Sequence, residues 1–180
     1  MLRLDVPVFE CPAWLERAVQ PACDALGIPK FAGVAHYAFT ALLLSFGLQY
    51  ASSVVSPRLF PSYYPTVRKK KEDWDLHIVG WVFSFIAAPL AISHILNPSK
   101  ELVRDPIYGF AAREARLSAV AAGYFAWDAY VSAKHVSTQG LGFLLHGAGC
   151  FAAFSYTLAP FLLYEGPNFL VCAPILPAVL

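Results

Sequence analysis

This chain contains little charge, and long parts of it contain none. Charged residues make up 14% of the 180 residues, whereas hydrophobic residues make up 58%. Three pairs of successive charges enclose gaps of 27, 24 and 30 residues, namely Lys30 and Arg58, Asp75 and Lys100, and Lys134 and Glu165. A helix of about 20 apolar residues crosses the hydrocarbon core of a bilayer. The gaps therefore predict a polytopic membrane protein.

A fourth stretch, from Leu117 to Ala133, contains one charged residue, Asp128. Together these stretches predict an all-α membrane helix bundle with four full spans and a partial fifth. The expected order is an interfacial segment (1–30), a first span (31–57), a basic loop (58–75) and a helix bundle (76–180) with further spans at 76–96, 117–133 and 141–163. Residues 167–180 include three prolines and are too few for a full span, so we expect a fifth helix that stops early.

Two further shortages exclude classes of function. The formal net charge is only +1, and no basic face of useful size remains outside the spans, so we expect no binding of nucleic acid. The chain has four cysteines, and their spacing matches no metal site, so we expect neither a metal nor another cofactor. A Cys11–Cys23 disulfide requires a lumenal N-terminus, and the sequence leaves that alternative open.

The first 30 residues do not resemble a cleaved signal peptide, because acidic residues interrupt any apolar core. These residues are Asp5, Glu10, Glu16 and Asp24. We expect the first span to act as a signal anchor instead. Apolar residues recur at helical spacing between residues 12 and 27, which predicts a short amphipathic helix at the membrane surface.

A compact basic cluster precedes the second span and consists of Arg68, Lys69, Lys70 and Lys71. Lys and Arg are divided almost evenly between the two sides of the predicted topology, but basic residues close to the end of a span act most strongly on its orientation. We therefore expect this loop in the cytosol. There the basic cluster would contact anionic lipids, and the loop would offer a surface to protein partners.

Two ionisable residues are expected to meet inside the membrane, where such groups are functional candidates because burying them is costly. Asp128 lies nine residues before Ser137, in the short loop between the third and fourth spans, and His146 lies nine residues after it. In an antiparallel hairpin these offsets give both residues the same depth, and Ser84 of the second span falls at a similar depth. The pattern predicts a polar cluster of Ser84, Asp128 and His146 at a lipid cavity or a helix contact.

Two roles for this cluster are open at this point. In the catalytic role, His146 acts as a general base and Asp128 orients its imidazole. In the structural role, the two side chains form a hydrogen bond between the helices, worth about 0.6 to 2 kcal/mol.

Four segments carry a resemblance to a known family. They are Lys71-Glu72-Asp73-Trp74-Asp75 at the start of a span, Asp105-Pro106 in the next loop, Ala122-Gly123-Tyr124-Phe125-Ala126-Trp127-Asp128, and Gly142-Phe143-Leu144-Leu145-His146. From Lys71 to Phe169 the chain resembles the TLC domain of ceramide synthases, the translocating-chain-associating membrane protein and a neuronal ceroid lipofuscinosis protein. The resemblance implies a helical bundle in the endoplasmic reticulum membrane and a role in lipid metabolism, lipid sensing or membrane-lipid balance.

The ceramide synthase branch implies an acyltransferase that uses acyl-CoA and a sphingoid base, with paired histidines and later paired aspartates. This chain departs from that pattern, because His146 is followed by Gly147 and no acidic pair comes later. It departs again near its end, where Tyr164 to Leu170 resembles the lead-in to the family's next block. The last helices of a six-helix domain do not follow, so we expect an incomplete bundle.

These observations favour a membrane protein of the endoplasmic reticulum that acts in lipid homeostasis, lipid sensing or lipid binding, with membrane lipids as its partners. The alternative is an acyl-CoA-dependent N-acyltransferase related to ceramide synthases, which would bind acyl-CoA or a sphingolipid and use His146 as its base. A further alternative, of another class, is a membrane scaffold or cargo adaptor.

Overall fold

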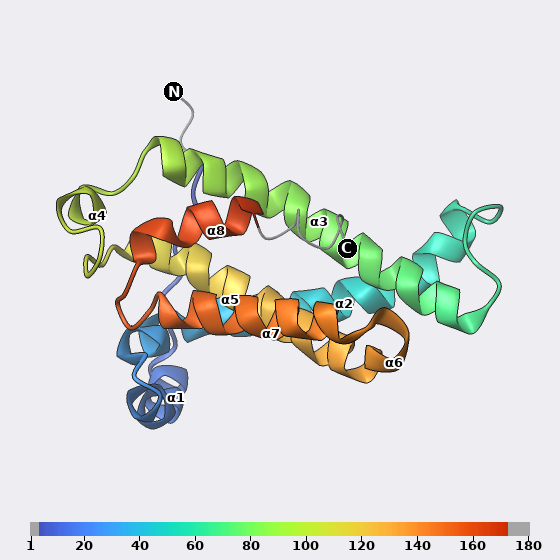
Figure 1. Ribbon diagram of the computed structural model, residues 1–180, viewed down its shortest axis with the longest axis horizontal. Coiled ribbons are helices and arrows are strands. Elements are labelled where there is room, and N and C mark those ends of the chain that lie inside the picture. Colours follow the sequence, from blue (N-terminus) through green and yellow to red (C-terminus); the bar gives the residue numbers. More distant parts are fainter. Residues whose placement is uncertain (1–3, 173–180) are drawn as a thin grey trace.

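The structure is a computed structural model that describes residues 4–172. The described residues form helices joined by turns and contain no strand, which confirms the all-α prediction. Figure 1 shows long helices that run roughly along one axis, with shorter helices at the ends. In chain order the elements are α1 (Ala13–Ala25), η1 (Pro29–Val34), α2 (Ala35–Leu59), α3 (Arg68–Leu96), α4 (Lys100–Arg104), α5 (Ala112–Lys134), α6 (Val136–Gln139), α7 (Leu141–Tyr156), η2 (Leu163–Glu165) and α8 (Gly166–Cys172).

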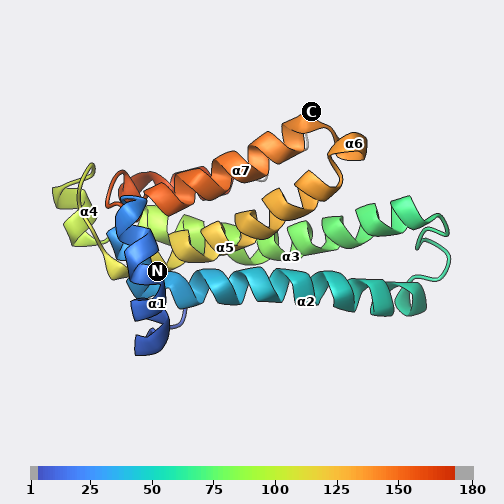
Figure 2. The same cartoon turned by 90° about the horizontal axis from the view of Figure 1, so that it is seen from below.

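Helix α5 is the central element of the bundle. It packs most extensively against α7 and α2, whereas α3 packs mainly against α8 and α2. Residues are buried along almost the whole of α5, from Arg113 to Ser132, and many of them are alanine, serine or glycine. Small side chains let the neighbouring helices come close, so α5 is enclosed by other helices (Figure 2).

Two glycines mark where the helix backbones come closest. A Cβ atom at Gly123 of α5 would overlap the backbone carbonyl of Ala38 in α2. A Cβ atom at Gly147 of α7 would lie 2.7 Å from Asp128 Oδ2 and 2.9 Å from the backbone nitrogen of Ala129. The hairpin of α5 and α7 that the sequence predicts is therefore present, and it depends on glycine at its contact.

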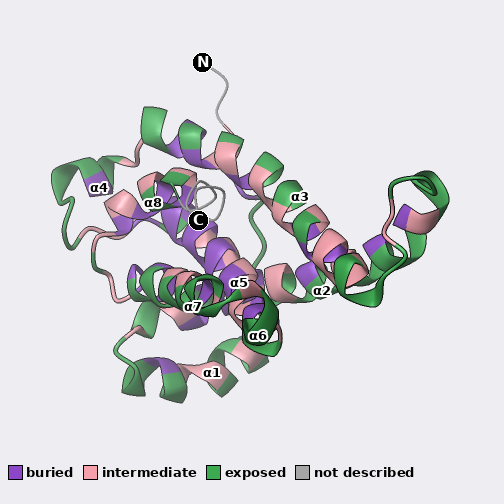
Figure 3. Ribbon diagram, turned by 45° about the vertical axis from the view of Figure 1, so that its right-hand side comes forward, coloured by how far each residue is buried: buried purple, intermediate pink, exposed green. Residues whose placement is uncertain are grey.

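The helices α2 and α3 are long and apolar enough to cross a membrane. The two candidate spans are Pro29–Leu59 and Arg68–Leu96, and in their most apolar windows only 33% and 28% of the residues are buried. Large apolar side chains on these helices are exposed instead, as for Leu43, which is 68% exposed. Figure 3 shows exposed segments, in green, along α3. The core helix of a soluble protein would bury such residues, so these outward faces indicate a membrane protein.

The predicted number of four full spans stays a prediction, because α5 and α7 are not both long enough and apolar enough to count as spans. Helix α5 is enclosed by other helices, so its sequence need not be apolar all round. Helix α7 is apolar but has only 16 residues, which at 1.5 Å per residue span about 24 Å, less than the hydrocarbon thickness of about 30 Å.

Several helix boundaries differ from those expected. Helix α3 begins at Arg68, so the basic cluster forms its first turn and does not lie in a loop. Helix α7 ends at Tyr156, and a turn in which Leu162 has a φ of 55° follows, so the fourth apolar stretch is not one continuous helix. The described part of the predicted fifth helix is α8, and residues 173–180 lie outside the described residues.

The N-terminal part agrees with the expected short helix, which the structure gives as Ala13–Ala25. In Figure 2 this helix lies across the end of the bundle, near the start of α2. The four cysteines are free thiols, so the Cys11–Cys23 disulfide that the sequence left open is not formed.

Candidate functional site

A cavity of about 710 Å³ lies between α3, α5 and α7. Cavities of roughly 300–1,000 Å³ are typical of small-molecule sites. Its walls consist of residues from these three helices and from α6: Leu76, His77, Gly80, Trp81, Phe83, Ser84, Phe85, Ala88, Tyr124, Phe125, Trp127, Asp128, Val131, Ser132, Gln139, Phe143 and His146. Most of them are apolar or aromatic, and a few polar groups stand among them.

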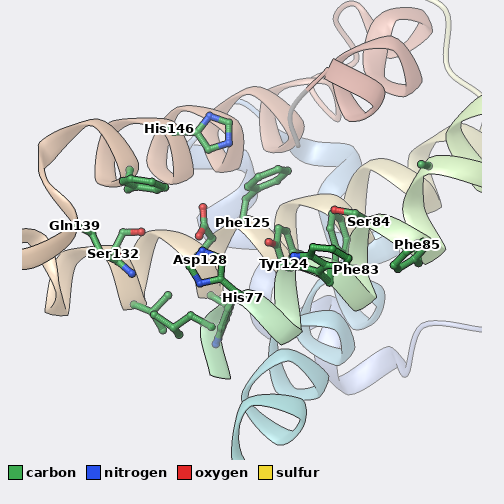
Figure 4. A pocket seen from close by; sticks show the side chains of 17 residues that line it. His77, Phe83, Ser84, Phe85, Tyr124, Phe125, Asp128, Ser132, Gln139 and His146 are labelled. Atoms are coloured by element: carbon green, nitrogen blue, oxygen red, sulfur yellow. The ribbon is translucent and has the colours of Figure 1, made fainter. Parts of the chain in front are cut away.

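The cavity has a polar end and an apolar end. His77, Ser132 and Gln139 line the polar end, which we call the mouth, whereas Phe85 lies at the far end (Figure 4). Ala88, three residues beyond Phe85 on α3, also lines the cavity. The mouth lies beside the first turns of α3, because His135 Nδ1, just before α6, is 3.9 Å from Glu72 Oε2 in α3. The basic cluster is therefore at the mouth end of the molecule.

Three small residues of α3 line the cavity and do not form a close helix contact. Gly80, Ser84 and Ala88 follow a spacing that lets two helix backbones approach closely. In the structure all three line the cavity, and the close approaches are made by Gly123 and Gly147 instead. The small residues of α3 thus leave space for an occupant of the cavity.

All three residues of the predicted polar cluster line the cavity, each from a different helix. Ser84 comes from α3, Asp128 from α5 and His146 from α7 (Figure 4). The hairpin therefore gives Asp128 and His146 the common depth that their equal distance from Ser137 predicts.

In the part of the chain that the structure describes, no hydrogen bond joins Asp128 to His146 or to Ser84. The hydrogen bond expected between Asp128 and His146 is therefore not formed there. The ring nitrogens of His146 lie 3.8 and 3.9 Å from Cys150 Sγ, one helical turn away. The imidazole also packs edge-on against Phe125, with ring centroids 5.9 Å apart. A role of His146 as a general base, or of the pair as a hydrogen bond between the helices, therefore stays a prediction.

Aromatic rings connect the cavity wall to the core. Phe83 of α3 stacks on Tyr124 of α5 with ring centroids 3.7 Å apart and planes 2° apart. Phe125 stacks on Phe154 of α7 at 5.5 Å. Such pairs contribute about 0.5–1.5 kcal/mol beyond their buried area. These stacks hold α3 and α7 on the two sides of α5 and so keep the cavity open between them.

The sequence interpretation missed a buried carboxylate near the mouth. Asp75 of α3 accepts hydrogen bonds from Ser52 Oγ of α2 at 2.6 Å and from Tyr64 Oη at 3.1 Å. Partial burial and the nearby Asp75 carboxylate raise the pKa of the Tyr64 phenol. Asp75 directly precedes a charge-free stretch, and the sequence predicts it as the last residue of the basic loop. The serines Ser52 and Ser56, one helical turn apart, were the available signal.

It also missed a buried ionic network at the other end of the bundle. Glu114 is only 1% exposed and accepts a hydrogen bond from Ser99 Oγ at 2.7 Å. Arg113 pairs with Asp5 and with Glu114, and it donates to the Asn97 carbonyl at 2.6 Å. His94 Nε2 lies 3.5 Å from Asp5 Oδ1. This network attaches the N-terminal segment to α3 and α5.

Within residues 4–172 no group of three or more His, Cys, Asp or Glu side chains is arranged to hold a metal ion.

Comparisons with known proteins agree with the sequence motifs. The chain is 28% identical over 159 residues to an uncharacterized TLC domain-containing protein of Schizosaccharomyces pombe, and the match covers 88% of this chain and 54% of that protein. It is 27% identical over 119 residues to topoisomerase I damage affected protein 4 of Saccharomyces cerevisiae, and there the match covers 63% of this chain and 42% of the yeast protein. The chain thus spans about half the length of these curated relatives.

No solved structure matches the chain. The TLC domain family matches residues 73–173, which include three of the four segments that carry the resemblance and the last three residues of the first one. Because this match extends over more than half of the residues, the chain belongs to the TLC domain family.

Proposed function

We propose that this protein is a multi-pass protein of the endoplasmic reticulum membrane that binds a membrane lipid in the cavity between α3, α5 and α7 and acts in lipid homeostasis. The observation that carries the proposal is the cavity itself, with its volume of about 710 Å³ and its largely apolar wall. A site with few polar groups among aromatic side chains favours a ligand that is itself mostly hydrocarbon.

The position of the cavity supports a ligand that comes from the bilayer. Two of its lining residues, Trp81 and Phe85, are 64% and 72% exposed and lie on the outward face of α3. An apolar cavity that opens on an apolar outer face is accessible to lipid chains without passage through water. Membership of the TLC domain family also supports a lipid-related role.

The proposal is tested by filling the cavity. Ser84→Trp places an indole in the cavity, whereas Ile86→Trp places the same group on the outer face of the same helix, where Ile86 is 59% exposed and does not line the cavity. Lipid that co-purifies with each protein is identified and quantified by mass spectrometry. We expect stoichiometric lipid with the wild type and with I86W, and loss of it with S84W.

Ala88→Trp, at the far end of the cavity, is a second filling variant in case S84W does not fold. The melting temperature of each variant in detergent identifies those that are folded. Equal lipid in the folded filling variants and in I86W would contradict the proposal.

A further inference from the structure

We propose that the ligand is a single-chain amphiphile with an anionic headgroup, bound with its headgroup at the mouth beside Lys69 and Lys70 and with its chain directed along α3 toward Ala88. This inference rests on the proposed function, since it concerns the occupant of the same cavity. It adds the charge and the orientation of that occupant.

The two lysines lie on the cavity side of α3. Residues seven apart on a helix lie on nearly the same face, two turns from each other. Lys70, His77 and Ser84 are related by this spacing, and the last two line the cavity. Lys69 falls on the same half of the helix, on the side of Phe83 and Gly80. Both lysines therefore extend the cavity wall beyond the mouth.

The basic side chains near the mouth differ in whether they already contact another side chain. Arg68 Nε is 3.2 Å from Glu72 Oε1, and the Lys71 ammonium lies over the Tyr64 ring at 5.8 Å from its centroid. No ion pair in the described residues involves Lys69 or Lys70, and both side chains are exposed. They are the two cations available at the mouth.

The acids at the mouth do not cancel these charges. Two acids lie on the cavity side of α3, and one of them, Glu72, is paired with Arg68 at 3.2 Å. The other is Asp73, whose backbone carbonyl accepts from His77 Nδ1 at 2.6 Å. Asp75, on another face, is buried and hydrogen-bonded to Ser52. Lys134, at the end of α5, is engaged in the same way as Lys71, with its ammonium over the Tyr130 ring at 5.6 Å from the centroid. Lys69 and Lys70 against Asp73 therefore leave the mouth positive.

The interior of the cavity, unlike the mouth, disfavours an anionic headgroup. Among the described residues that line the cavity, Asp128 is the single acid, and the walls beyond it are formed by side chains such as Phe83, Phe85 and Phe125. A negative headgroup would be repelled by Asp128 and would lose its hydration among these rings. A hydrocarbon chain incurs neither cost. The distribution of charge therefore directs the headgroup outward and the chain inward.

The shape of the cavity favours one chain. From Leu76 to Ala88 the lining residues follow α3 for 12 residues, which at 1.5 Å per residue is about 18 Å. A cavity of about 710 Å³ that follows the helix over this length accommodates one extended hydrocarbon chain. The headgroup chemistry at the mouth is that of a phosphate or a carboxylate, which lysine binds as a point charge.

The test uses two lysophospholipids with the same acyl chain, lysophosphatidic acid and lysophosphatidylcholine, which differ in net headgroup charge. Each is added to the purified, delipidated full-length protein in a neutral detergent, and bound lipid is measured by native mass spectrometry. The variants are K69Q/K70Q, its charge-matched control K100Q/R104Q on α4 at the opposite end of the bundle, and S84W.

We expect the wild type and K100Q/R104Q to prefer lysophosphatidic acid by about 25-fold, since each of the two lysines near such a charge contributes roughly a factor of five. K69Q/K70Q should lose most of this preference while it still binds lysophosphatidylcholine. S84W should bind neither lipid.

The other outcomes separate the two proposals. Equal binding of both lipids by the wild type, blocked by S84W, would overturn the anionic headgroup and leave lipid binding in the cavity intact. A preference that survives K69Q/K70Q would overturn the assignment to these lysines. Binding that S84W does not affect would mean surface attraction alone, and it would contradict the proposed function together with the inference.

Discussion

At the scale of single residues, the bundle depends most on places where a side chain is absent or where a buried acid is bonded. Gly147 and Gly149 lie two residues apart on α7, yet an added Cβ meets Asp128 and Ala129 at Gly147 and nothing within 4 Å at Gly149. Asp75 is buried in the interface of α2 and α3, and serine and tyrosine hydroxyls satisfy its carboxylate. Each feature leads to a prediction with a control that lies beside it.

Gly147→Ala should destabilise the protein, because the new methyl group forces α7 away from α5. We expect the free energy of unfolding to fall by about 1–3 kcal/mol. Gly149→Ala should change it little or raise it slightly, because alanine favours the helix. Thermal unfolding in detergent, followed by the fluorescence of the tryptophans, compares the two. Similar shifts in both variants would show that the α5–α7 contact is looser than described.

Ser52→Ala should also destabilise, because it removes the hydroxyl that donates to the buried Asp75 carboxylate at 2.6 Å. A hydrogen bond to a charged group contributes about 1.5–3 kcal/mol, and the Tyr64 hydroxyl remains to satisfy part of the loss. Ser53→Ala is the control, since Ser53 is exposed and bonds only the Tyr50 carbonyl of its own helix. The melting temperature should fall for S52A alone, and an unchanged S52A would argue against the buried bond.

At the scale of elements, the position of α3 relative to α5 decides whether the cavity exists. These two helices touch less than α5 touches α2 or α7, and the stacked pair of Phe83 and Tyr124 is prominent among their contacts. Phe85, two residues further along α3, also lines the cavity but points to the outer face and is mostly exposed.

Phe83→Ala should therefore loosen α3, with a loss of about 2 kcal/mol in the free energy of unfolding from the stack and the partly buried ring. Phe85→Ala should cost less than about 0.5 kcal/mol, as for other exposed positions. Limited proteolysis within 60–67 and within 97–99, the connections on either side of α3, should be faster in F83A than in F85A. Equal rates would mean that other contacts hold α3 in place.

Much of this arrangement could be predicted from the sequence, and the limits of the prediction are physical. The equal distances of Asp128 and His146 from Ser137 gave their common depth, because a hairpin with a short connection allows little else. The buried ion pair of Arg113 and Glu114 could not be found in this way, because adjacent charges at a helix start usually face solvent. Which helix covers them depends on contacts distant in sequence, such as Asp5 with Arg113.

The span count shows the same limit. Helical periodicity and charge-free length identify α2 and α3, whose outer faces are apolar. They cannot distinguish a helix that faces lipid from one that other helices enclose, as α5 is. The small residues Gly80, Ser84 and Ala88 illustrate the limit inside the site, because their spacing fits both a helix contact and an open cavity wall.

At the scale of the whole molecule, the two ends of the bundle differ in charge. Arg58, the basic cluster and Lys134 lie at the mouth end, with Glu72, Asp73 and Asp75 as the acids. The opposite end contains the ionic network of Arg113 and Glu114 and more acids than bases among the described residues. Basic residues near span ends favour the cytosolic side.

We therefore expect the mouth end in the cytosol. A glycosylation site inserted between Phe60 and Val67 should stay unmodified, whereas one inserted near Asp105, in the connection of α4 to α5, should be glycosylated. Protease protection of the same tagged proteins in sealed microsomes is an independent measurement. The same modification state at both positions would contradict a membrane crossing by α3.

The contact of Asp5 with Arg113 has a consequence for how the molecule is made. The two residues are separated by 108 positions, so their ion pair can form only after the ribosome has added the first turn of α5. At about 5–20 residues per second, that interval lasts roughly 5 to 20 s. During this time α2 and α3 are already entering the bilayer, but Arg113 of α5, to which the N-terminal segment docks, has not yet been synthesised. The residues that precede α1 can therefore dock only after the first turn of α5 has been synthesised. Their docking marks the assembly of the bundle around this central helix.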